Sequence, residues 1–322
     1  MLNQIFIILQ CSRVFSLPMT IMSWIVIYVY SSLVAGHIKY GILALIGVCM
    51  AHLAANVFDD YFDYKSLIKQ VNFNKREYLK NSQKTKCRYL IAGLVKPKQI
   101  FALACIYLAI AALIGTFLFL KCGIGVIYFA LAGGILAVLY SFLSKIMLSE
   151  VTVALAYGPA LFGGIYYVMT KTYSWDAIIL SIPTMIVTVI LLYIHTVMDF
   201  DFDINEGHRT IANSFNSRLD SLVILKWLLI LAYIAPVLLC IFDIADWQVF
   251  AVWLTIPLAV DLYKSMVDFA ANPESVPEHK WYHFPMENLM GAPGFMTRIY
   301  QSRNLMIYYS LILTISIIFA LW

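Results

Sequence analysis

Residues 42–63 read ILALIGVCMAHLAANVFDDYFD, an apolar run that passes directly into a cluster of acidic residues. A helix needs about 20 mostly apolar residues to cross a bilayer, so this run is typical of a transmembrane helix. The acids then stand at one end of that helix. Because a carboxylate within a bilayer is costly, such a cluster is a candidate functional site.

The whole chain has the composition of a membrane protein. Of its 322 residues, 62% are hydrophobic and 12% are charged, and the mean hydropathy is +0.83. The apolar runs predict an all-α, multi-pass membrane bundle of about nine transmembrane helices. Nothing divides residues 1–322 into two domains. The predicted helices cover residues 15–36, 40–58, 100–120, 123–142, 151–169, 178–197, 223–242, 247–263 and 305–322.

The basic residues predict the orientation of the bundle, because Lys and Arg collect in cytoplasmic loops. With the N-terminus inside, alternating helices place 19 of the 22 Lys and Arg residues on the inner side. The outer side holds only Lys39, Lys121 and Lys171. The net charge of +4 therefore reflects membrane topology, and it does not indicate nucleic-acid binding.

A second acidic cluster follows the predicted helix at 178–197 and reads DFDFDINE over residues 199–206. Residues three and four apart share a helix face, so Asp199, Asp203 and Glu206 lie together. In the first cluster the shared face carries Asn56, Asp59, Asp60 and Asp63. Both clusters end even-numbered helices, so they are expected at the same inner membrane level.

These oxygen-rich faces suit Mg²⁺, which takes one or two carboxylates and completes its shell with water and substrate phosphates. Solvated helix ends are the plainer interpretation of any single Asp, and two clusters at helical spacing argue against it. Basic residues near the clusters are candidates to pair with phosphate oxygens. They are Arg13, Lys84, Lys86, Arg88, Lys145 and Arg209.

Two histidines precede the clusters at matching positions. His52, Asn56 and Asp60 are spaced four apart, and His195, Asp199 and Asp203 repeat the spacing. Such a histidine can orient an acceptor molecule or pair with a carboxylate, although a histidine packed in a helix bundle is the commoner case.

The chain resembles the UbiA superfamily of intramembrane prenyltransferases. Its two acidic clusters are similar in order and spacing to the two aspartate-rich motifs of that superfamily. Asn56-x-x-Asp59-x-Tyr61-x-Asp63 is similar to the Asn-x-x-Asn-x-Tyr-x-Asp pattern of the menaquinone-pathway branch, with Asp59 in place of the usual Asn. A departure is that no Gly and Asp follow near Leu67. The further matching positions are Arg88, Gly93, Tyr140, Lys145, Glu150, Gly158, Pro159, Gly164, Tyr166, Tyr167, Asp199, Asp203, Gly207, Arg209 and Thr210.

The resemblance implies transfer of a polyprenyl chain from its diphosphate to an aromatic acceptor. In the menaquinone branch the acceptor is 1,4-dihydroxy-2-naphthoate, which loses its carboxylate as carbon dioxide. The resemblance also implies an enzyme of the bacterial plasma membrane, with the active site on the cytoplasmic side and lipid around the bundle.

The resemblance gives each candidate residue a role. The catalytic residues are expected to be Asp60, Asp63, Asp199 and Asp203. The Mg²⁺ ligands are expected to be Asn56, Asp59, Asp60, Asp63, Asp199 and Asp203. The substrate-binding residues are expected to be Arg13, Asn56, Tyr61, Lys84, Arg88, Tyr140, Lys145, His195 and Arg209. Among them, Tyr61 and Tyr140 are expected to shield an allylic cation with their rings.

Two alternatives remain open from the sequence. The same chemistry could act on another acceptor, such as 4-hydroxybenzoate, homogentisate, a haem or a glycerol phosphate lipid. An ion-coupled transporter could instead use intramembrane acids as a relay. Transport is disfavoured, because the acids lie at helix ends and Gly or Pro does not interrupt the helices at 40–58 and 178–197.

Overall fold

The computed structural model describes residues 11–35, 38–70, 73–80, 87–278, 280–282 and 293–321, and every regular element within them is a helix. The elements include 3₁₀ turns (η1, η3 and η4) and a π-helical turn (η2). In chain order they are η1 (Val14–Ser16), α2 (Pro18–Ala35), α3 (Gly41–Leu67), α4 (Lys75–Lys80), α5 (Arg88–Ala92), α6 (Pro97–Cys122), α7 (Gly125–Leu143), α8 (Ser149–Leu155), η2 (Ala156–Ala160), α9 (Leu161–Thr170), α10 (Trp175–Met198), α11 (Phe200–Asn205), η3 (Ala212–Ser214), α12 (Arg218–Ile234), α13 (Pro236–Ile241), η4 (Trp247–Thr255), α14 (Ile256–Ala271) and α15 (Pro293–Leu321).

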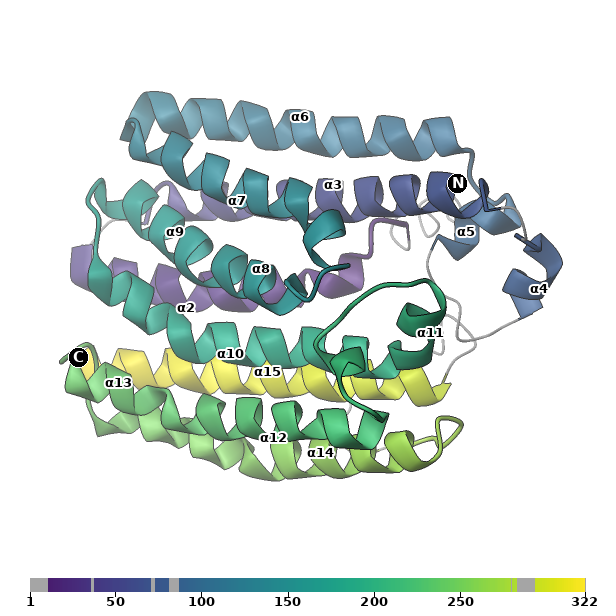
Figure 1. The fold of residues 1–322 in the computed structure, drawn as a ribbon. Helices are drawn as coiled ribbons and strands as arrows, with labels where there is room; N and C mark the ends of the chain where they lie inside the picture. Colours follow the sequence, from purple (N-terminus) through teal and green to yellow (C-terminus); the bar gives the residue numbers. More distant parts are fainter. Residues whose placement is uncertain are drawn as a thin grey trace.

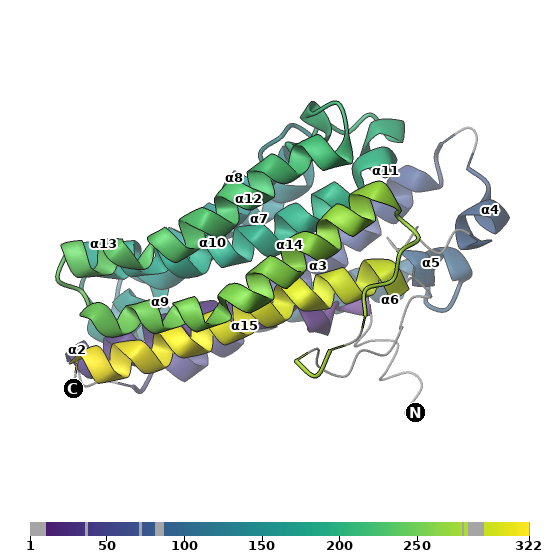
Figure 2. The ribbon, with the colours of Figure 1, turned by 90° about the horizontal axis from the view of Figure 1, so that it is seen from below.

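The predicted multi-pass helical bundle is confirmed. Within the described residues, eight helices are long and apolar enough to cross a membrane. A shorter apolar helix at Gly125–Tyr140 corresponds to the remaining predicted segment, 123–142. The long helices lie side by side along one direction (Figure 1). In both views α4, α5 and α11 gather at one end, where α3 and α10 also end (Figure 2). We call this the acidic end of the bundle.

Several helices run further than the apolar pattern predicted. The helix predicted at 40–58 continues to Leu67, so the first acidic cluster is helical, and the helix predicted at 305–322 begins at Pro293. The pattern followed only the apolar part of each helix, whereas polar residues extend helices beyond the hydrocarbon core. Pro236 divides the helix predicted at 223–242 into α12 and α13.

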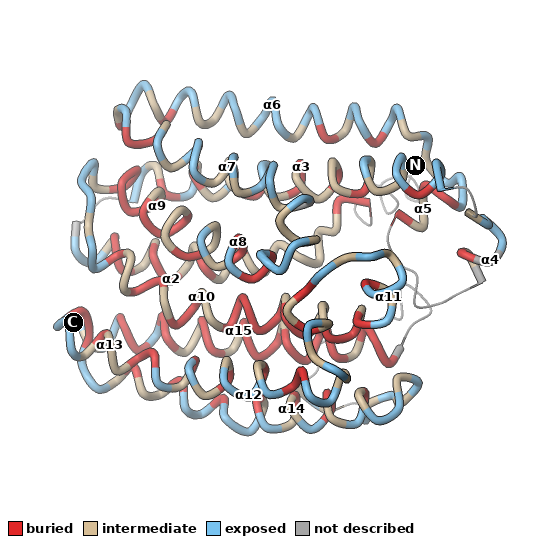
Figure 3. Tube along the Cα trace, viewed as in Figure 1, coloured by how far each residue is buried: buried red, intermediate tan, exposed pale blue. Residues whose placement is uncertain are grey.

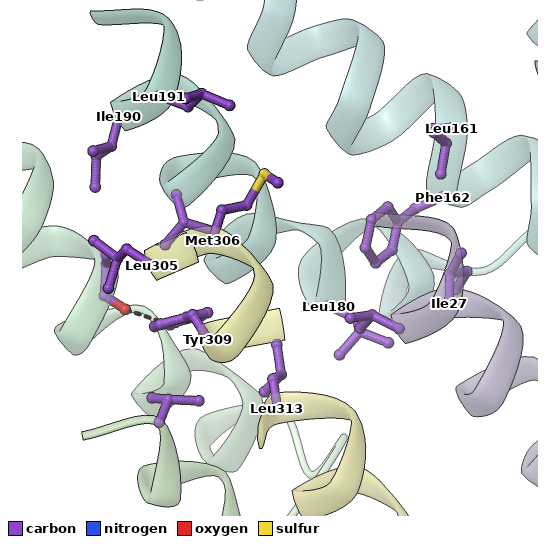
Figure 4. Packing of buried hydrophobic residues seen from close by; sticks show 14 of the residues in the cluster. Ile27, Leu161, Phe162, Leu180, Ile190, Leu191, Leu305, Met306, Tyr309 and Leu313 are labelled. Carbon is purple, nitrogen blue, oxygen red and sulfur yellow. Dashed lines mark hydrogen bonds between the residues drawn. The ribbon is translucent and has the colours of Figure 1, made fainter. Parts of the chain in front are cut away.

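The interior of the bundle is built on α10, on the span Ser149–Thr170 (α8, η2 and α9) and on α15, which are the most buried of the candidate membrane spans, whereas α6 is largely exposed (Figure 3). Apolar side chains on α6, such as Leu113 and Leu120, are exposed and suited to lipid. Buried residues from α2, α9, α10 and α15 pack together in the interior (Figure 4). There the Tyr309 hydroxyl donates a hydrogen bond to the Ala232 carbonyl at 2.5 Å, which satisfies a buried polar group.

Two glycines allow α7 and α9 to approach closely. A Cβ atom at Gly125 would lie 2.3 Å from the ring of Tyr167, and one at Gly163 would lie 2.4 Å from the ring of Phe129. Larger side chains at either position would force the two helices apart. The close contact fixes one wall of the cavity described below.

Candidate active site

A cavity of about 890 Å³ opens between the helices, and both acidic clusters contribute to its lining. Asn56, Asp59 and Asp63 line it from α3, while Asp199 and Asp203 line it from the junction of α10 with α11. Most of the remaining lining is apolar and comes from α2, α6, α7, α9 and α15. The two segments also meet outside the cavity, where Gln70 donates a hydrogen bond to Glu206 at 2.9 Å.

Asp60 is buried and lies outside the cavity lining. Its carboxylate forms an ion pair with Arg13 and accepts a hydrogen bond from the Tyr89 hydroxyl at 2.8 Å. Burial, together with the charge of Asp60, raises the pKa of Tyr89, so this hydroxyl keeps its proton and remains a donor. Arg13 lines the cavity and also lies 3.9 Å from Asp59. Asp60 therefore holds a cation at the edge of the cavity.

The second cluster is organised by two histidines. His195 Nδ1 lies 3.0 Å from an oxygen of Asp199, and His208 Nδ1 lies 3.5 Å from an oxygen of Asp203. All four side chains line the cavity. Asp201 points to the opposite side, where it is exposed and pairs with Arg218 at 2.7 Å. The cluster therefore presents two of its three aspartates to the cavity.

Backbone hydrogen bonds fasten the loop after α7 to the loop after α11. The amide of Met147 donates to the Arg209 carbonyl at 2.8 Å, and the amide of Arg209 donates to the Lys145 carbonyl at 3.0 Å. The two loops form an isolated parallel bridge between Ile146 and Arg209. Lys145 lines the cavity at this point, as does Tyr140 at the end of α7. The bridge thus holds a lysine near the second acidic cluster.

Arg303 of α15 is a lining residue that sequence reasoning missed. Its guanidinium lies over the ring of Tyr300, 4.3 Å from the ring centroid, and donates a hydrogen bond to Asn304 at 2.9 Å. No signal for it was visible in the sequence, because the helix was predicted to begin only at residue 305, whereas in the structure Arg303 lies inside the candidate membrane span Gly294–Leu321. Among the described residues, Arg13, Lys145 and Arg303 are the Lys and Arg side chains of the lining, which also holds four carboxylates.

Some predicted site residues lie elsewhere. The Tyr61 ring packs against Phe62 and Phe101, outside the lining of the cavity. The Arg88 guanidinium donates to the Leu79 carbonyl, and Arg209 is outside the lining although its backbone holds the loop of Lys145. Lys84 and Lys86 fall outside the residues that the structure describes. The structure brings together Arg13, Asn56, Asp59, Asp63, Tyr140, Lys145, His195, Asp199 and Asp203.

The donor set bears on which metal could bind. Across the described part of the chain, no three His, Cys, Asp or Glu side chains form a group close enough to hold a metal ion by themselves. Mg²⁺ does not need such a group, since it is commonly held by one or two carboxylates together with water and phosphate oxygens. Carboxylate oxygens from two helices that line one cavity, with the side-chain amide of Asn56, fit Mg²⁺ that arrives with a phosphate-bearing substrate.

Comparison with known proteins gives one family match. Residues 16–286 match the model of the UbiA prenyltransferase family. Among curated protein sequences, none matches this chain.

The fold also matches solved structures, including two that cover most of this chain. One is a structure of digeranylgeranylglyceryl phosphate synthase, at 16% identity and a TM-score of 0.60, with 98% of this chain and 99% of that chain covered. The other is the apo structure of a UbiA homologue from Aeropyrum pernix K1, at 16% identity and a TM-score of 0.58, with 93% and 97% covered. At this identity the likeness shows the fold alone.

Proposed function

Since the chain belongs to the UbiA prenyltransferase family, we propose that it transfers a polyprenyl chain from its diphosphate to an aromatic acceptor within the membrane. The observation that carries the proposal is the shared cavity. Its lining includes carboxylates of both acidic clusters and the basic side chains of Arg13, Lys145 and Arg303, and most of the remaining lining is apolar. A diphosphate with a long hydrocarbon tail has the same division into a charged and an apolar part.

The charged end of the cavity suits a magnesium diphosphate. Mg²⁺ bound there would neutralise negative charge that develops on the leaving oxygen. Its proposed ligands are Asn56, Asp59, Asp63, Asp199 and Asp203, and Asp60 contributes by holding Arg13.

Basic side chains would add to the stabilisation of the leaving group. Arg13, Lys145 and Arg303 offer donors to the diphosphate oxygens as the bond between carbon and oxygen breaks. The electron pair leaves with the diphosphate, and an allylic cation remains. The ring face of Tyr140 can shield this cation, because a cation is attracted to an aromatic face.

The apolar part of the cavity suits the isoprenoid tail. Its lining includes Leu118, Phe119, Val126, Phe129 and Ile165. These side chains would exclude water, which otherwise captures the cation and gives a prenyl alcohol.

For the acceptor we propose 1,4-dihydroxy-2-naphthoate, which places the enzyme in menaquinone biosynthesis. Support comes from the Asn56-x-x-Asp59-x-Tyr61-x-Asp63 motif and from Tyr140 with Lys145. The distribution of Lys and Arg supports an orientation with the acidic end in the cytoplasm, and the proposed pathway places the enzyme in a bacterial plasma membrane.

Product analysis tests the acceptor. Purified protein in lipid nanodiscs is given one prenyl diphosphate, Mg²⁺ and an equimolar mixture of 1,4-dihydroxy-2-naphthoate, 4-hydroxybenzoate, homogentisate and a glycerol phosphate lipid. We expect the prenylated, decarboxylated naphthoquinol as the main product by mass spectrometry. Another prenylated acceptor would correct the acceptor alone, and no prenylated product would contradict the proposed reaction.

A further inference from the structure

A polar cluster lies in the wall of the cavity, away from the carboxylates. It consists of Ser16 from η1, Thr20 from α2, His52 from α3 and Tyr157 from η2, and all four side chains line the cavity. His52 precedes Asp59 by seven residues on α3, which is roughly 10 Å along the helix axis. The cluster therefore begins beside Asn56 and extends deeper into the bundle than the carboxylates of the proposed diphosphate site.

The hydrogen bonds of Ser16 determine the tautomer of His52. The single proton of the Ser16 hydroxyl goes to the Arg13 carbonyl, at 2.8 Å. The Ser16 oxygen must then accept hydrogen bonds from His52 Nε2 and from the Asn56 amide, both at 3.0 Å. His52 consequently carries its proton on Nε2 and offers a lone pair at Nδ1.

Two hydroxyls share that lone pair. Thr20 Oγ1 lies 2.6 Å from His52 Nδ1, and Tyr157 Oη lies 3.1 Å from the same atom. The Tyr157 hydroxyl also interacts with the Thr20 hydroxyl. Both protons are satisfied when one of the two hydroxyls donates to Nδ1 and the other hydroxyl donates to the first. In either arrangement the Tyr157 oxygen, which has two lone pairs, keeps at least one of them as an acceptor at the cavity wall.

The local backbone brings Tyr157 to this position. Tyr157 lies in the π-helical turn Ala156–Ala160, where the amide of Leu161 bonds to the Ala156 carbonyl. Pro159 has no amide proton and interrupts the α-helical pattern, so the wider turn relieves the break. Such turns in long helices frequently occur at functional sites.

The chemistry of the cluster identifies its ligand. An isoprenoid tail has no hydrogen-bonding group, so a polar cluster gives it no attraction. An aromatic acceptor carries a hydroxyl that can donate to the Tyr157 oxygen. We propose that Tyr157, with Thr20 and His52 behind it, forms the subsite that binds a hydroxyl group of the aromatic acceptor.

This assignment rests on the proposed prenyl transfer and adds the position of the acceptor. The diphosphate occupies the end with the carboxylates, and the acceptor hydroxyl lies at Tyr157. Between them the allylic carbon, which has lost the diphosphate, bonds to a ring carbon of the acceptor, and that ring carbon releases a proton or, in the proposed naphthoate, carbon dioxide. Tyr157 touches the acceptor, whereas Thr20 and His52 are positioning residues that orient its hydroxyl.

Steady-state kinetics of the full-length protein in nanodiscs test the subsite, using the acceptor that product analysis identifies. Tyr157→Phe should raise the KM for the acceptor about tenfold, which corresponds to ~1.4 kcal/mol, with the KM for prenyl diphosphate within about twofold of wild type. Thr20→Val should act in the same direction. Tyr167→Phe is the matched control, because it also removes a tyrosine hydroxyl from the span Ser149–Thr170. The Tyr167 hydroxyl donates to the Cys122 carbonyl, and Tyr167 lies outside the cavity lining.

A second measurement uses an acceptor analogue whose hydroxyls are methylated, and determines its inhibition constant as a competitive inhibitor. The analogue cannot donate to Tyr157, so wild type and Tyr157→Phe should bind it equally. An unchanged KM for the acceptor in Tyr157→Phe, or equal changes for both substrates, would overturn the subsite while prenyl transfer stands. A wild-type protein that prenylates no aromatic acceptor would overturn the proposed function and the subsite with it.

Discussion

An Asp199→Asn variant should transfer prenyl groups at least about a thousandfold more slowly than wild type, a loss of ~4 kcal/mol of transition-state stabilisation. Asn preserves the shape of the side chain and removes its charge. Asp199 lines the cavity beside His195, at 3.0 Å, so the change removes a charge that would hold magnesium on the diphosphate. The rate is measured with purified protein in nanodiscs at saturating prenyl diphosphate and Mg²⁺.

Asp201→Asn is the matched control. Asp201 belongs to the same acidic cluster, but its side chain is 66% exposed and pairs with Arg218 outside the cavity. We expect this variant to keep its rate within about threefold of wild type, because an exposed ion pair contributes little. Equal losses in the two variants would show that the cluster acts through general charge or folding, and would contradict the role of Asp199.

A Lys145→Met variant should lose about a hundredfold in kcat, the usual effect of removing one donor that stabilises developing negative charge. Lys145 lines the cavity on the loop that the Ile146–Arg209 bridge holds in place. Lys145→Arg keeps the positive charge and should recover most of the rate. The readout is single-turnover transfer, which separates the chemical step from product release.

Lys264→Met is the control for this change. Lys264 is an exposed residue of α14, outside the cavity lining, and it too is predicted to lie on the inner side of the membrane. Its loss should leave kcat unchanged. If Lys145→Met also keeps the wild-type rate, the leaving group does not depend on this lysine.

The bundle could be predicted from sequence because its signals are local. A long apolar run specifies a membrane helix by itself, and each of the nine predicted segments corresponds to a helical segment of the structure. The acidic clusters were visible for the same reason, since helical spacing places Asn56, Asp59 and Asp63 on one face. These features depend only on neighbouring residues.

Helical spacing could not separate Asp60 from Asp59. Asp59 and Asp60 follow Asn56 by three and by four residues, so helical spacing assigns both of them to the face of Asn56. In the structure Asp60 turns to Arg13 and Tyr89, which approach from η1 and α5. Which carboxylate reaches the cavity is therefore decided by segments that lie 29 and 47 residues away along the chain.

Contacts between helices that are far apart in the chain also could not be predicted from the sequence. Arg303 reaches the cavity from α15, and Tyr157 reaches His52 across 105 residues through a π-helical turn. A single sequence reports which residues share a helix face, but it does not report which faces of different helices meet. Pro159 inside a predicted span was the local hint of an altered turn near Tyr157.

The most direct test asks whether the two acidic clusters bind one ligand together. It measures the binding of inorganic pyrophosphate with Mg²⁺ to the protein in nanodiscs by calorimetry. The variants are Asp63→Asn, Asp199→Asn and the two combined. If one magnesium pyrophosphate bridges both clusters, each single change should weaken binding strongly, and the double change should weaken it little further. Two independent losses that simply add, or full binding in either single variant, would contradict a shared site.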